Sequence, residues 1–162
     1  MRKIGCILIL LVVVSSSTEA FGQYGRYRRG DRFRPHIEVG VRGLYDYDLK
    51  VWGAGGQLVV PVFRGILFYP NGSVLFADNQ NYTQYNLDVR LNQFQLYFGG
   101  GLAFVEGARL NEEGTQQGSD LFVGLQPRLF RMPFLTPFVE ARWTYIQIFQ
   151  IFTLHFGVNF RL

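Results

Sequence analysis

The chain has 162 residues, of which 48% are apolar and 17% aromatic, whereas only 17% carry a charge. This length fits one domain, and so low a charged fraction is unusual for a soluble surface, where about 25% is typical. The formal net charge of +4 lies wholly in residues 1–35, since residues 36–162 hold nine basic and ten acidic side chains; a nucleic-acid partner is therefore excluded for the folded part, and the single cysteine, Cys6, excludes a disulfide framework.

Residues 1–22 have the three regions of a cleaved export signal. Two basic residues precede an apolar run over 4–14, and a polar region follows over 15–20, with cleavage expected after Ala20 or Gly22. The apolar run is too short for a membrane helix, which needs about 20 residues. The sequence therefore predicts export without a helical anchor.

Residues 23–35 contain five arginines against Asp31 and show no apolar periodicity. A segment of this composition cannot bury enough apolar surface to fold. We expect a flexible, arginine-rich periplasmic tail.

From His36 onward, apolar and polar residues alternate with period two, which is typical of half-buried strands. Six segments alternate clearly: 36–45, 82–92, 94–104, 119–129, 136–145 and 153–162. Two weaker segments are 51–63 and 65–77, and we expect Pro70-Asn71-Gly72 to form a bulge or a break in the second. The sequence thus predicts an all-β domain over 36–162 with eight strands, each long enough to cross a bilayer when tilted.

The predicted links alternate between tight turns and longer polar loops, as in bacterial outer-membrane barrels with periplasmic turns. The tight links are 63–65, 92–93 and 131–135; the polar ones are 46–50, 78–81 and 106–118. The link near 146–151 lacks turn residues. Alternation alone also fits a secreted, soluble lipocalin-like barrel that binds an apolar ligand, because both barrels have the same period. Aromatic-rich apolar faces, and polar faces with glycine, glutamine and both signs of charge, favour the membrane barrel.

The last strand resembles the assembly signal of outer-membrane barrels, with Leu162 in place of the usual terminal phenylalanine. Its apolar positions are Leu154, Phe156, Val158, Phe160 and Leu162. Together with PVFRGILFYP, YNLDVRL, YFGGGLAF, LFVGLQPRL and PFVEARWTY, it makes residues 36–162 similar to the outer-membrane β-barrel domain family, the small eight-stranded barrels. The resemblance implies an eight-stranded antiparallel up-and-down transmembrane β-barrel in the outer membrane. It also implies a monomer whose partners are outer-membrane lipids, lipopolysaccharide and the barrel-assembly machinery.

If the polar face lines the lumen, its charges must pair, because an isolated buried charge is very costly. The predicted interior charges are Glu38, Arg42, Asp88, Arg90, Arg128, Glu140, Arg142, His155 and Arg161, accompanied by the amides of Gln95, Gln126 and Asn159. Eight strands leave room for little more than side chains. We therefore expect a self-paired interior without a large pore, and the alternative is a gated ion path along Glu140 and Arg142.

Catalytic and metal signals are weak. A lipid-modifying hydrolase needs a serine supported by histidine, but residues 23–162 contain only Ser73 and Ser119, and neither lies near His155 in the sequence. His36 and His155 fall at different levels of the predicted barrel and should not share an ion. The acidic residues Glu106, Glu112, Glu113 and Asp120 read as a solvated loop, with divalent-cation binding as the alternative.

These observations predict a non-enzymatic outer-membrane barrel without a cofactor. Its expected role is structural, in envelope integrity or in surface interaction. A soluble ligand-binding barrel and an outer-membrane lipid-modifying enzyme remain as alternatives.

Overall fold

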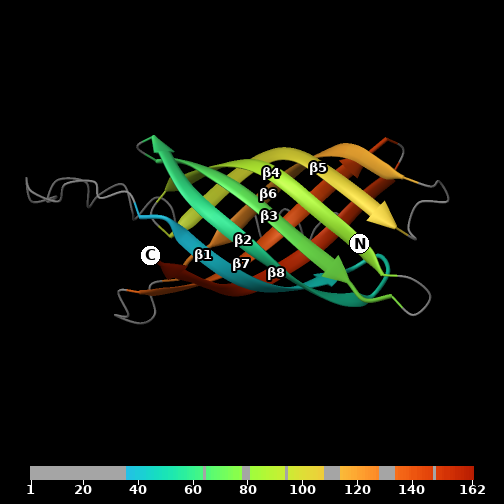
Figure 1. The fold of residues 1–162 in the computed structure, drawn as a ribbon, viewed down its shortest axis with the longest axis horizontal. Helices are drawn as coiled ribbons and strands as arrows, with labels where there is room; N and C mark the ends of the chain where they lie inside the picture. The colour runs from blue at the N-terminus through green and yellow to red at the C-terminus, as the bar shows by residue number, and fades with distance from the viewer. Residues whose placement is uncertain are drawn as a thin grey trace, which may run out of the picture. The chain divides into compact units, whose positions relative to one another are not determined.

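Eight antiparallel strands close into a barrel in the computed structural model, which describes residues 36–63, 65–77, 81–93, 95–107, 114–127, 134–147 and 149–162 (Figure 1). The strands are β1 (Glu38–Asp46), β2 (Val51–Phe63), β3 (Ile66–Leu75), β4 (Tyr82–Gln93), β5 (Leu96–Gly107), β6 (Thr115–Leu125), β7 (Leu135–Ile146) and β8 (Phe149–Arg161). The predicted fold class is confirmed. The predicted export signal and arginine-rich tail lie outside the described residues.

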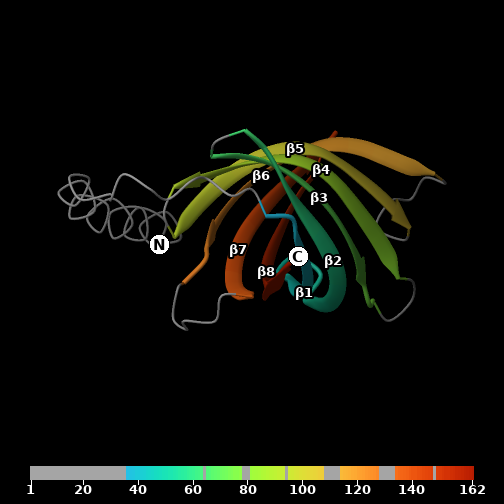
Figure 2. The ribbon, with the colours of Figure 1, turned by 60° about the vertical axis from the view of Figure 1, so that its left-hand side comes forward.

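Each strand pairs with the next along the chain, and β8 returns to pair with β1. The closing ladder runs without a shift from Glu38 opposite Arg161 to Asp46 opposite Thr153. Figure 2, turned by 60°, shows the strands curving around from β1 to β8. Closure leaves no strand with an open edge, which is the condition for a sheet to stand in hydrocarbon. Among the described residues, no helix is long and apolar enough to cross a membrane.

The links between strands fall at two ends of the barrel. We call the end with links 47–50, 76–81, 108–114 and 147–148 the loop end, and the end with links 64–65, 94–95 and 126–134 the turn end. The prediction of a tight link between the sixth and seventh strands is wrong, and the seventh link, for which the sequence shows no turn residues, is short. The β6–β7 link at the turn end is long, because β6 ends at Leu125, whereas β7 and β8 join through two residues at the loop end. Gln147, in that short link, has a φ of 40°, a conformation common in tight hairpins.

The expected bulge or break at Pro70-Asn71-Gly72 is also wrong. These residues lie within β3, whose register to β4 runs regularly from Pro70 opposite Leu87 to Gly72 opposite Tyr85. The register to β2 is the same on both sides of this segment, although no ladder pair forms at Tyr69 or at Pro70, which lacks an amide hydrogen. The irregularity lies instead in β2, between Pro61 and Phe63.

The two faces of the barrel are inverted relative to a water-soluble protein. Buried side chains inside include Arg90, Glu140 and Arg142, each with no exposed surface. Outside, large apolar side chains such as Leu121 and Val139 have more than half of their surface exposed. An outward apolar face with a polar interior is typical of transmembrane barrels, so the structure places these strands as lipid-facing walls.

Replacing Leu121 with arginine should lower the free energy of unfolding by about 2–4 kcal/mol, because the side chain lies outside near the middle of β6. Thr115→Arg on the same face, at the first residue of β6, is the matched control and should cost only about 0–1 kcal/mol near the membrane surface. Urea unfolding in phospholipid vesicles measures both values. Equal costs at the two positions would contradict the lipid-facing assignment.

The interior is layered along the barrel. An apolar layer at the loop end comprises Leu44, Leu75, Tyr82, Val105, Ile146 and Ile151. A second, mostly aromatic layer toward the turn end comprises Val59, Tyr69, Tyr97, Phe122 and Phe138. The charged side chains of β4, β6 and β7 are held in the lumen together with these layers. Side chains therefore fill the lumen, as expected for eight strands.

Three rings of the turn-end layer lie directly against glycines. Across the β5–β6 ladder, Tyr97 faces Gly124 and Phe122 faces Gly99. Across the β7–β8 ladder, Phe138 faces Gly157. A Cβ built on any of the three glycines would overlap the facing ring. Because glycine has no side chain, these three positions leave the space into which the rings pack.

Candidate functional site

Arg142 lies at the centre of the interior charge cluster. It projects from β7 and contacts one carboxylate from each of β4, β6 and its own strand: Asp88 at 2.8 Å, Asp120, and Glu140 at 3.0 Å. All four side chains are buried. Arginine suits this position because its planar guanidinium offers five donors in fixed directions. The cluster ties β4 to the consecutive strands β6 and β7.

A second group of side chains connects Arg42 of β1 to the carboxylate of Glu140. Arg42 lies 4.0 Å from Glu140, and its guanidinium donates to Nδ1 of His155 at 3.0 Å. Because arginine only donates, Nδ1 accepts and the ring proton is on Nε2, which donates to Thr153 Oγ1 at 2.8 Å. Both nitrogens of His155 are therefore engaged in fixed contacts.

Tyrosine hydroxyls and an amide also contact the carboxylates of this cluster. The hydroxyls of Tyr69 and Tyr97 lie 3.2 and 3.1 Å from Glu140 Oε2. The side-chain amide of Asn71 donates to Asp88 at 2.8 Å. The two tyrosines thus contact the Glu140 oxygen opposite the one nearest the arginines, whereas Asn71 shares Asp88 Oδ2 with Arg142. Oδ1 of Asp88 and of Asp120 has no hydrogen-bond partner among the described residues.

Arg90 differs from the other interior arginines because no carboxylate pairs with it among the described residues. Its guanidinium carbon lies 3.7 Å from the ring centre of Tyr97 and 5.4 Å from that of Tyr69, and its Nε donates to Asn92 at 2.7 Å. Both terminal nitrogens are buried without a hydrogen-bond partner in the described part of the chain. The faces of the two rings supply the electrostatic attraction that stabilises this cation.

The remaining predicted interior charges lie elsewhere. Glu38 and Arg161 meet at the turn end at 3.4 Å, and the side chain of Arg161 is 44% exposed. Arg128 lies outside the described residues. The structure therefore brings Arg42, Asp88, Glu140, Arg142 and His155 together, and sets Arg90 beside them against aromatic rings.

Two buried carboxylates were not in the predicted interior set. Asp120 was expected in a solvated acidic loop, and this is wrong, because β6 begins at Thr115 and carries Asp120 into the lumen. Asp46 lies at the loop end of β1, where it accepts hydrogen bonds from the amides of Asp48 and Leu49 and from the Tyr82 hydroxyl. Both share the parity of the neighbouring interior positions, so alternation was the signal that would have found them.

No catalytic or metal constellation forms among the described residues. Ser73 is buried in β3 and Ser119 is exposed on β6, while His155 is engaged by Arg42 and Thr153. No group of three histidine, cysteine, aspartate or glutamate side chains is placed to hold a metal ion in the part of the chain that the structure describes. The arrangement can hold charge and fix strand positions, but it presents no activated nucleophile.

The apolar residues of the last strand point outward. Leu154, Phe156 and Phe160 are exposed on β8, and Leu162 follows directly after the strand. The backbone amide of Leu162 donates to the carbonyl of Ile37 at 2.9 Å, so pairing with the first strand extends to the last residue.

No protein-family model and no curated protein sequence matches the chain. Solved structures do match. The N-terminal β-barrel domain of Pseudomonas aeruginosa OprF is similar with a TM-score of 0.60 and 14% identity, over 80% of this chain and 100% of that one. Ail, the attachment invasion locus protein of Yersinia pestis, has a TM-score of 0.53 and 11% identity, over 79% and 97%.

Neisserial surface protein A (NspA) matches with the same TM-score and identity as Ail, over 79% of this chain and 96% of that one. At such identities the similarity establishes the fold. The resemblance to small eight-stranded outer-membrane barrels is confirmed, and the chain has their transmembrane β-barrel fold.

Proposed function

We propose that this chain is a non-enzymatic outer-membrane β-barrel protein that contributes to envelope integrity or to surface interaction. The observation that carries the proposal is the inverted burial of the barrel wall, with arginines and carboxylates inside and leucine, valine and phenylalanine outside. Exposing such an apolar exterior to water is unfavourable, whereas contact with the hydrocarbon of a membrane carries no such cost. The fold shared with OprF, Ail and NspA supports the same location.

The layered lumen argues for a structural role rather than a transport role. Apolar side chains fill the barrel at the loop end, and aromatic rings fill it toward the turn end. An ion moving along Glu140 and Arg142 would have to cross both layers without hydration, which is very costly. We therefore favour paired structural charges over a gated ion path.

The alternative of a soluble lipocalin-like barrel fits the described residues poorly. Such a barrel needs an apolar lumen for its ligand, but this lumen contains Arg42, Asp88, Asp120, Glu140 and Arg142. A lipid-modifying enzyme is also disfavoured, because His155 faces the lumen and contacts no serine among the described residues. The wall, by contrast, fits the lipid environment on which the proposal depends.

Fractionation of cells that produce the full chain tests the location. The protein should float with the outer membranes and shift in gel mobility on boiling, because a closed barrel resists detergent until it is heated. Recovery in the soluble periplasmic fraction would contradict the proposal.

Conductance measurements test the closed lumen. The purified full chain in a planar lipid bilayer should show no stepwise ion conductance, because both apolar layers exclude water. The N-terminal β-barrel domain of OprF, reconstituted in the same bilayers, provides a comparison of similar fold. Regular single-channel openings of this chain would overturn the structural role in favour of an ion path.

A further inference from the structure

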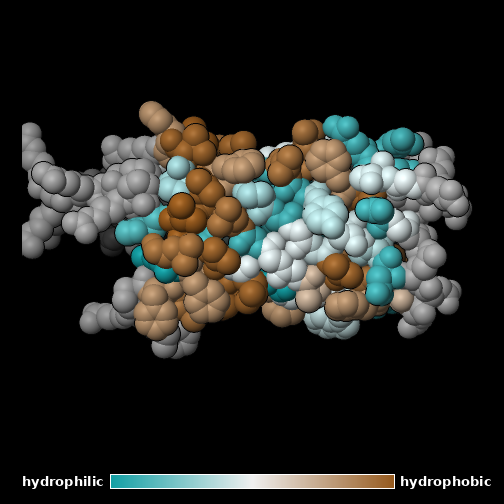
Figure 3. Space-filling model, in the orientation of Figure 1, coloured by the Kyte–Doolittle hydropathy of each residue, from teal (hydrophilic) through white to brown (hydrophobic). Residues whose placement is uncertain are grey.

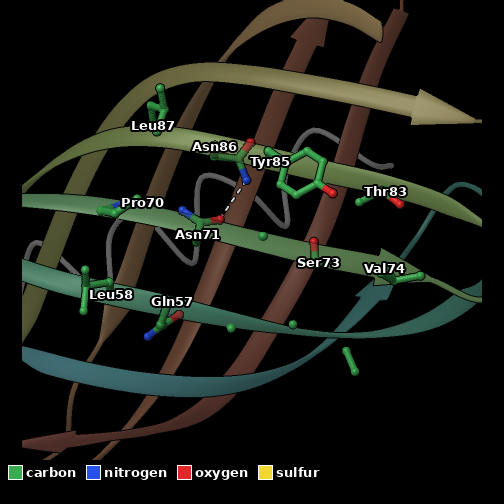
Figure 4. Close-up of a pocket in the computed structure, with 14 residues that line it drawn as sticks. Gln57, Leu58, Pro70, Asn71, Ser73, Val74, Thr83, Tyr85, Asn86 and Leu87 are labelled. Carbon is green, nitrogen blue, oxygen red and sulfur yellow. Dashed lines mark hydrogen bonds between the residues drawn. The ribbon is translucent and has the colours of Figure 1, made fainter. Parts of the chain in front are cut away.

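A groove lies on the outer wall of the barrel over β2, β3 and β4 (Figure 4). It has a volume of about 590 Å³, within the range of small-molecule sites, and it is open toward the surroundings of the barrel. Its outward-facing lining residues are Ala54, Gly56, Leu58, Pro70, Gly72, Val74, Thr83, Tyr85 and Leu87. The groove is therefore part of the wall that we propose to face lipid.

Small residues create the groove. The outer faces of β2 and β3 carry Ala54, Gly56 and Gly72 here, whereas elsewhere the outer positions carry residues such as Trp52 and Phe68. A Cβ added at Gly56 would meet nothing closer than the Gly40 carbonyl at 3.7 Å, so the space beside it is open. The ring of Tyr85 lies against Gly72, where a Cβ would meet it at 3.2 Å. The recess thus begins at Gly56 and is bounded by Tyr85.

The groove has one polar end and one apolar end. Thr83 and Tyr85 lie toward the loop end of β4, and the Tyr85 hydroxyl points toward Thr83 in Figure 4. The apolar end of the groove lies toward the turn end of the barrel. It is lined by the side chains of Leu58, Pro70 and Leu87. Over this face, Figure 3 shows pale surface between apolar side chains gathered toward the turn end and polar ones toward the loop end.

We propose that this groove binds one acyl chain of an outer-leaflet lipid, the lipid A of lipopolysaccharide. The chain would lie along Gly56 and Leu58, and its polar end would stay near the hydroxyls of Thr83 and Tyr85. The inference rests on the proposed function, because it requires that the loop end faces the outer leaflet.

Two features favour an acyl chain over a second copy of the protein. The groove is continuous with the exposed apolar wall, where Val89 of β4 and Val41 of β1 are each about half exposed, so lipid surrounds it on both sides. The wall of another barrel is convex and its side chains are attached to a rigid backbone, whereas a flexible hydrocarbon chain is thin enough to fill a recess between Leu58 and Tyr85. Filling such a recess restores dispersion contacts that an empty one forfeits.

The test fills the groove from the protein side. Full-length chain and Gly56→Leu are reconstituted in phosphatidylethanolamine vesicles with purified lipid A, extracted in mild detergent, and weighed by native mass spectrometry. The unmodified protein should retain one lipid A, and Gly56→Leu should retain at least 10-fold less. Val123→Leu, which enlarges an outward residue on β6, is the matched control and should retain lipid A as the unmodified protein does.

Thr83→Val provides a second variant that leaves the groove open but removes the polar hydroxyl, and it should reduce retention several-fold. Equal retention by all variants, or retention of phosphatidylethanolamine instead of lipid A, overturns the inference. A dimer that Gly56→Leu abolishes overturns it in favour of a second copy. Heat-modifiable folding in the vesicles is measured for every protein, and only variants that insert are compared for retention of lipid A. Failure of the unmodified chain to insert would contradict the proposed function and not the groove alone.

Discussion

Replacing Arg142 with methionine should destabilise the barrel by about 3–5 kcal/mol, the cost of removing one partner from a buried ion pair. Methionine roughly preserves the length of the side chain, so the expected loss is electrostatic rather than steric. Asp88, Asp120 and Glu140 would remain buried without the cation that now contacts all three. Equilibrium urea unfolding in phospholipid vesicles measures the change.

Neutralising the acids provides the control for Arg142→Met. Adding Asp88→Asn and Asp120→Asn to the methionine variant should recover most of the lost stability, because these two carboxylates then carry no charge and Glu140 keeps Arg42 as its cation. Arg161→Ala, which breaks the exposed pair with Glu38, should cost no more than about 1 kcal/mol. An Arg142→Met protein as stable as the unmodified chain would contradict the central role of this arginine.

Deleting residues 159–162 should abolish assembly of the barrel. The deletion removes the pairing of β8 with residues 38–40 of β1. It also removes the Asn159 side chain, which accepts a hydrogen bond from Gln57 at 2.5 Å. The backbone groups exposed on β1 would then face hydrocarbon at a cost of several kcal/mol each. The fraction of heat-modifiable protein in isolated outer membranes measures the loss.

Leu162→Phe is the companion to that deletion. It restores the aromatic residue usual at this place in the family that the strand resembles, and adds ring area at the membrane surface, where aromatic side chains are favoured. Assembly should be unchanged or improved. If the truncated chain folds as well as the full one, closure does not depend on residues 159–162, and the role assigned to the last strand is wrong.

Alternation predicted most of the fold because the period of two is a local property. It placed Arg42, Asp88 and Arg142 on one face of their strands, and the structure puts all three in the lumen. Local pattern could not say which charges meet. Whether Arg142 contacts Asp120, or Arg90 stacks on Tyr97, depends on strand register and closure, which alternation leaves open.

Aromatic residues limited the prediction in another way. Tyr69, Phe122 and Phe138 suit either the lipid face or a packed interior, so an apolar pattern cannot assign them to the turn-end layer. The predicted turns and link lengths were partly wrong because residue type alone did not mark the turns. Glycine and proline normally mark turns, yet Gly72 and Pro70 lie within β3, while Gln147 turns the chain without either.

The pairing of rings with glycines bears on how the barrel finds its alignment while it closes. A slip of one residue between neighbouring strands would turn every side chain to the opposite face and is opposed by the membrane itself. A slip of two residues preserves the faces, so the hydrophobic pattern cannot detect it. It would, however, move Tyr97 from Gly124 to Phe122 or Gln126, where a side chain occupies the space that the ring needs. The spaces beside these glycines therefore disfavour a two-residue register shift, which contact with lipid alone does not disfavour.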